Sequence, residues 1–110
     1  MNICILVSRP VIRQNLTNVA QGLELLITPF PDAQLVIADR RADLEKALNE
    51  RKHALQIIWD PHVPPAGDLL GPHAERFKIY RVIEDAEYGG WTHMWDYIRA
   101  VRGQLEGYRD

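Results

Sequence analysis

Apolar residues along the chain fall into four short continuous runs, separated by longer segments in which they recur periodically. The runs span 3–7, 34–38, 55–59 and 77–83 and are rich in branched side chains, and the last alternates more than the others. Short apolar runs of this kind are typical of strands buried on both faces of a parallel sheet. We therefore predict four strands, with 77–83 nearest an edge of the sheet.

Between the strands, apolar positions recur every three or four residues, as they do on the buried face of a helix. This spacing predicts helices over 10–26, 41–52 and 91–108, and a weaker signal predicts a short helical turn within 67–75. The last of the helices is the clearest, because its apolar face is long and rich in aromatic side chains. Strand and helix thus alternate along the chain.

Polar residues stand before the first two predicted helices, where a side-chain oxygen can accept a hydrogen bond from a free backbone N–H. Ser8 precedes the helix that begins at Pro10, and a proline suits the first helical turn because its missing N–H needs no partner there. Asp39 precedes the helix that begins at Arg41. We expect Ser8 and Asp39 to act as helix caps.

The alternation of strands and helices predicts a single α/β domain over 1–110, a three-layer sandwich with helices on both faces of a small parallel sheet. For four strands the simplest order is 2-1-3-4, a Rossmann-like, flavodoxin-like arrangement. In that order the strand at 3–7 lies between those at 34–38 and 55–59. The strand at 34–38 is then expected at an edge.

Composition narrows the classes of function. The chain has 110 residues, a formal net charge of -2 and one cysteine. A weak negative charge disfavours binding to the nucleic-acid backbone. The single Cys4 lies in a strand and excludes an intrachain disulfide and a cysteine-based zinc site, which suits the cytoplasm. No apolar stretch approaches the ~18 to 20 residues of a membrane span, so no membrane association is expected.

Candidate chemistry gathers where the predicted strands end. In an open parallel sheet, ligands bind outside the carboxyl ends of the strands, where the strand order reverses. In the predicted order this crevice lies between 3–7 and 55–59. The candidate crevice residues are Ser8, Arg9, Asp60 and His62, with Asp39, Glu84 and Asp85 at the rim.

Asp60 has two alternative interpretations. With His62 and Glu84 it is suited to a small enzyme, or to a divalent metal site of oxygen and imidazole ligands. Alternatively, it only ends the strand at 55–59 and caps the proline-rich loop at 61–65. No cofactor is predicted beyond the possible divalent metal.

Three motifs resemble the receiver domain of bacterial response regulators. They are the segment RPVIRQ at 9–14 after the first strand, Asp60 followed by Pro64 four residues later, and EDAEY at 84–88 after the fourth strand. In that family the third-strand aspartate accepts a phosphoryl group, so the resemblance implies this role for Asp60. Val7-Ser8-Arg9 stands where the family carries two acids that hold magnesium. The resemblance therefore implies a non-catalytic regulatory or assembly module that binds other proteins.

A second likeness involves the segments 57–62 and 79–85, which are similar to the amino-terminal half of two-domain glycosyltransferases. In those enzymes such strand ends line the acceptor cleft, and a separate half binds the nucleotide sugar. This likeness implies that the chain is a fragment that needs a second part for activity.

A protein partner is expected on physical grounds as well. A sheet of four strands has exposed edges that natural proteins cover. The aromatic last helix is suited to provide the cover in a homodimer, and its interface candidates are Trp91, Trp95 and Tyr97.

Overall fold

The computed structural model of the protein describes residues 1–81, 98–100, 102 and 103. The strands are β1 (Asn2–Leu6), β2 (Leu26–Ile27), β3 (Leu35–Ala38), β4 (His53–Ile58) and β5 (Phe77–Arg81). The helices are α1 (Pro10–Gly22), η1 (Phe30–Asp32), α2 (Arg41–Asn49), η2 (Gly67–Leu69) and α3 (Leu70–His73). The predicted interface residues Trp91, Trp95 and Tyr97 lie outside the described residues.

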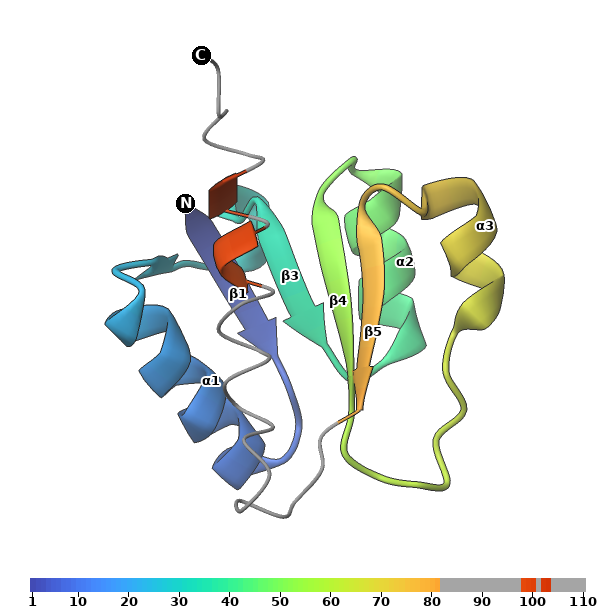
Figure 1. The fold of residues 1–110 in the computed structure, drawn as a ribbon, viewed down its shortest axis with the longest axis horizontal. Coiled ribbons are helices and arrows are strands. Elements are labelled where there is room, and N and C mark those ends of the chain that lie inside the picture. Colours follow the sequence, from blue (N-terminus) through green and yellow to red (C-terminus); the bar gives the residue numbers. More distant parts are fainter. Residues whose placement is uncertain (82–97, 101, 104–110) are drawn as a thin grey trace.

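The strands form one parallel sheet in the order β2-β1-β3-β4-β5, and Figure 1 shows β1, β3, β4 and β5 side by side. The parallel α/β prediction is confirmed, and β5 lies at an edge as expected. The strand count is five rather than four. The prediction for 34–38 was wrong, because β2 takes the edge position beside β1 while β3 lies between β1 and β4.

Strand β2 escaped the sequence pattern because Leu26 continues the helical spacing of α1. The helix ends instead at Gly22, since Glu24 adopts a left-handed backbone with φ 58°. The Leu25 N–H then bonds to the Ala20 carbonyl (2.8 Å) and the Glu24 N–H to the Gln21 carbonyl (3.0 Å). This is a Schellman motif, which turns the chain out of the helix and into the sheet.

Helix α2 ends in the same way, earlier than predicted. Arg51 has φ 61°, and the Lys52 N–H bonds to the Ala47 carbonyl at 2.9 Å. Neither left-handed position holds a glycine, which is the usual sequence signal for such an end. The predicted helices at 10–26 and 41–52 were therefore too long at their carboxyl ends.

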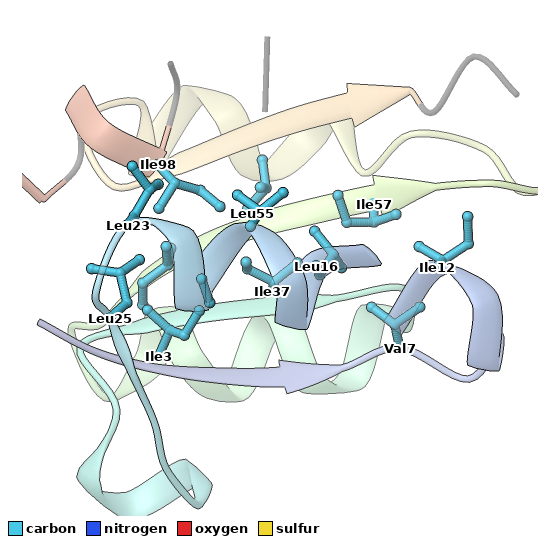
Figure 2. Close-up of a cluster of buried hydrophobic side chains, with 13 residues drawn as sticks. Ile3, Val7, Ile12, Leu16, Leu23, Leu25, Ile37, Leu55, Ile57 and Ile98 are labelled. Carbon is cyan, nitrogen blue, oxygen red and sulfur yellow. The ribbon is translucent and has the colours of Figure 1, made fainter. Parts of the chain in front are cut away.

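The two faces of the sheet bury separate apolar clusters. Alternate strand residues such as Ile37 and Leu55 pack against Leu16 of α1, as Figure 2 shows, and this cluster also holds Ile98. Val36 belongs to the second cluster, which lies against α2 on the other face. The three-layer arrangement is thus confirmed.

Cys4 lies in the cluster on the α2 side and is 4% exposed. Burial, reinforced by the charge of Asp43, raises the pKa of its thiol. A buried thiol with a raised pKa is a poor nucleophile. Within the described part of the chain, no helix is long and apolar enough to cross a membrane.

Candidate functional site

The strand order determines where the crevice of the sheet lies. The chain passes outward from β1 to β2 and then returns across β1 to β3, so the order reverses between β1 and β3. The prediction that the crevice lies between 3–7 and 55–59 was wrong, because β3 separates those strands. The residues that follow β1 and β3 are Val7 with Ser8, and Asp39.

Asp39 connects three strand ends through one carboxylate oxygen. Its Oδ2 atom accepts hydrogen bonds from the Ser8 N–H (3.0 Å), the Ser8 hydroxyl (2.6 Å) and the Trp59 indole N–H (2.9 Å). Ser8 follows β1, Asp39 follows β3 and Trp59 follows β4. We call these three residues the Asp39 junction.

These contacts correct the predicted helix caps. The residue before α1 is Arg9 and the residue before α2 is Arg40, and neither makes a side-chain capping bond. Ser8 and Asp39 bond to each other instead of to the helices. Their separation of 31 positions explains why a local pattern did not reveal the contact.

The junction favours an ionised Asp39. Burial raises the pKa of its carboxyl group, but the hydrogen bonds from Ser8 and Trp59 together outweigh burial and lower it below the ordinary value of 3.8. The second carboxylate oxygen, Oδ1, is buried and has no hydrogen-bond partner among the residues that the structure describes. Within this part of the chain, the hydrogen bonds to the Asp39 carboxylate therefore all go to Oδ2.

Two cavities meet at the junction, and both are lined by Ser8, Asp39 and Arg40. One of about 170 Å³ is also lined by Ile57, Ile58, Trp59, Asp60 and Val63. The other, of about 260 Å³, lies against Ile5, Leu6 and Val7, with Arg13 and Asp43. The first cavity combines an apolar wall with two carboxylates and a guanidinium group.

Arg9 extends the junction by a cation–π contact. Its guanidinium carbon lies 5.3 Å from the centre of the Trp59 ring. Trp59 was not among the predicted site residues, yet it bonds Asp39 through its N–H and contacts Arg9 through its ring. The available signal was its place directly after a buried strand, the same signal that singled out Asp60.

Asp60 serves the loop that follows β4. Its Oδ1 atom accepts the His62 N–H at 2.9 Å, and its carbonyl accepts the Val63 N–H at 3.1 Å. This is an Asx turn, in which a side chain takes the place of a backbone acceptor. The contact between Asp60 and His62 runs through the His62 backbone. Glu84 and Asp85 lie outside the described residues.

Gln56 stabilises the same loop by hydrogen bonds to its backbone, although it was not predicted. Its side chain is 2% exposed, accepts the Ala66 N–H at 2.8 Å and donates to the Pro64 carbonyl at 3.4 Å. A polar residue inside the apolar run 55–59 was the signal that could have identified it. The loop is thus anchored at both ends, by Asp60 and by Gln56.

Direct support for a metal site is lacking in the described ranges: no group of three or more His, Cys, Asp or Glu residues there is arranged to hold an ion. Comparison with known proteins finds no matching family model, no similar curated protein and no similar solved structure. The class of the protein therefore follows from its fold, a five-stranded parallel α/β sandwich of the flavodoxin-like order.

Proposed function

We propose that the protein is a non-catalytic, receiver-like regulatory or assembly module that acts by binding other proteins. Its strand order is that of flavodoxin-like folds, which include receiver domains. Fold alone does not define function. The proposal therefore depends on Asp39, the acid that lies where the strand order reverses, and on whether its carboxylate is already hydrogen-bonded.

The observation that carries the proposal is the use of Asp39. In receiver domains the phosphoacceptor follows the third strand, and in this sheet the residue after β3 is Asp39, whereas Asp60 follows β4. One oxygen of Asp39 is already taken up by Ser8 and Trp59. Ser8 also stands where the family carries magnesium-binding acids. We therefore interpret Asp39 as a structural residue that joins three strand ends, not as a phosphoacceptor.

A fixed rim favours recognition of a partner. Hydrogen bonds join the ends of β1, β3 and β4, and the loop after β4 is held by Gln56. A surface that is ordered before binding loses less conformational entropy when a partner docks. The exposed Arg40, which lines both cavities, lies on this rim.

The non-catalytic part is tested by intact-mass spectrometry with magnesium and acetyl phosphate. We expect no gain of a phosphoryl group for the wild type or for Asp39→Ala and Asp60→Ala. A gain in the wild type that disappears in either variant would show that the acid is a phosphoacceptor and would refute this part of the proposal.

The binding part is tested by affinity purification of the tagged chain with quantitative mass spectrometry. We expect a protein partner whose binding is saturable and is lost with Arg40→Glu. The control Lys78→Glu makes the same kind of charge change at an exposed residue of β5 and should keep the binding. Enrichment that is equal for both variants would place binding elsewhere and contradict a role for the junction rim.

A ligand-binding protein or small enzyme is the second candidate, favoured by the cavity of about 170 Å³ beside Asp39 and Asp60. The Oδ1 atom of Asp39, which accepts no hydrogen bond from the described residues, is the group that a cation would bind. A ligand that binds only the folded state raises the melting temperature. Melting with magnesium, manganese or zinc therefore distinguishes the candidates, and a rise that Asp39→Asn abolishes would support this second one.

A further inference from the structure

We propose that a second copy of this chain docks on the sheet edge formed by β2 and on the neighbouring face of α1, in an antiparallel two-fold arrangement. The inference goes beyond the proposed function, because it concerns a surface other than the rim at Arg40. Figure 1 shows α1 and the outermost strand on the same side of the molecule, beside β1.

The outer edge of β2 is apolar, and no other described strand pairs with it. Among the described strands β2 pairs only with β1, and its two side chains are exposed, Leu26 at 63% and Ile27 at 40%. Natural edge strands are usually blunted by charges, by proline or by a covering segment. Strand β2 contains no charge and no proline. Its free backbone groups and its side chains are thus suited to pairing with another strand.

The outward face of α1 lacks charge. Val11, Gln14, Asn18 and Gln21 are exposed and follow helical spacing, and Gln14 donates a hydrogen bond to Asn18 at 3.0 Å. Arg13 is the one charged residue among the 13 of α1, whereas the nine residues of α2 include four. Depletion of charge is the compositional mark of interface cores.

Self-complementarity selects a second copy as the partner. Two exposed charges among the described residues lie at the two ends of this surface, Arg13 in the first turn of α1 and Glu24 between α1 and β2. In an antiparallel two-fold pairing of β2 with its copy, Glu24 of each chain approaches the end of α1 that carries Arg13 in the other. A two-fold interface makes each such contact twice.

The part of β1 that β2 does not pair with lies next to this contact. Strand β1 pairs with β2 only at Asn2 and Ile3, so its edge beyond Ile3 is not covered by β2. The cavity of about 260 Å³ along Ile5, Leu6 and Val7 is bordered by Arg13 and Arg40 and also by Asp39 and Asp43. Glu24 of the second copy would therefore meet Arg13 at a hollow rather than at a packed surface.

The test measures the mass of the chain by sedimentation equilibrium from nanomolar to tens of micromolar. We expect a concentration-dependent rise from 12.7 kDa to twice that mass. Leu26→Lys places like charges near the two-fold axis and should raise the dissociation constant by about tenfold or more. The matched control is Leu70→Lys on α3, a residue 37% exposed, which should leave the constant unchanged.

Charge exchange tests the orientation of the two copies. Arg13→Glu and Glu24→Arg should each weaken the dimer by juxtaposing like charges, and the double variant should restore most of the loss. Circular dichroism confirms that each variant is folded. Absence of restoration would refute the antiparallel arrangement.

A wild type that stays at one chain mass, or a dimer that Leu26→Lys does not weaken, would overturn the inference. Neither result would touch the proposed function, since phosphoryl transfer and partner capture test that function separately. A monomeric wild type that captures a different protein, with loss in Leu26→Lys, would likewise exclude the second copy as the occupant of this edge.

Discussion

Asp39 and Asp60 each follow a buried strand, but their carboxylates stabilise different things. Asp39 accepts three hydrogen bonds from two other strand ends, whereas Asp60 accepts one from its own loop. We expect Asp39→Ala to lower the free energy of unfolding by about 2 kcal/mol, since the partly buried N–H of Trp59 loses its acceptor and the Ser8 hydrogen bonds are lost. Asp60→Ala should cost about 1 kcal/mol or less. Urea denaturation of both variants measures the difference, and equal losses would contradict it.

The contribution of the Asp39 carboxylate to stability should depend on pH. Because the pKa of Asp39 is lowered on folding, the unfolded chain binds the proton more readily, and acid destabilises the fold. The contribution of the charge is present above the ordinary pKa of 3.8 and is lost as the pH falls through the lower folded value. The stability gap between wild type and Asp39→Asn should therefore be constant near neutrality and narrow below about pH 4. A gap that narrows between pH 5 and 7 would point to another group.

At the scale of elements, helix ends determine where strands begin. Helices α1 and α2 both end in Schellman motifs with non-glycine residues at positive φ. A left-handed backbone costs an L-residue about 1 kcal/mol, which glycine avoids. Arg51→Gly, on the exposed end of α2, should thus stabilise the protein by up to about 1 kcal/mol. The neighbouring Glu50→Gly, at φ -92°, should destabilise it. Thermal melting of the pair measures the sign, and destabilisation by Arg51→Gly would contradict the prediction.

At the scale of the whole molecule, a residue far from the sheet in sequence completes the core on the α1 side. Ile98 is fully buried beside Leu23 and Leu55, as Figure 2 shows, and Arg102 donates to the Leu23 carbonyl at 2.7 Å. Ile98→Ala should destabilise the protein by about 2 to 5 kcal/mol through the cavity it leaves. The exposed Arg99→Ala should change stability by less than about 0.5 kcal/mol. Chemical denaturation separates the two, and a loss below that of Arg99→Ala would show that Ile98 does not support the core.

Most of the fold could be predicted from the sequence because its signals are local. The apolar runs identified β1, β3, β4 and β5 to within two residues at their amino ends, and helical spacing identified α1 and α2. Strand β2 could not be found, because Leu26 fits the helical pattern and only the left-handed turn at Glu24 ends the helix. The missed strand then misplaced β3 in the sheet.

The candidate site was predictable only in part. Position after a strand identified Ser8, Arg9, Asp39 and Asp60 as residues of the carboxyl edge, where the structure places them. Their mutual contacts could not be predicted. Asp60 was expected where the strand order reverses, but the structure places Asp39 there. The positions of Trp59 and Gln56 were noticeable in the sequence, but their hydrogen-bond partners, Asp39 and the loop at 64–66, could not be read from it.

The sequence by itself determined the periodic elements, the parallel α/β class and the residues that end each strand, because these depend on spacings within a few positions. Only the tertiary structure decided that β2 lies at the edge, that the strand order reverses between β1 and β3, and that Asp39 is bonded to Ser8 and Trp59. Those features depend on contacts between residues 20 to 31 positions apart, and such contacts form only when the strands take their order in the sheet.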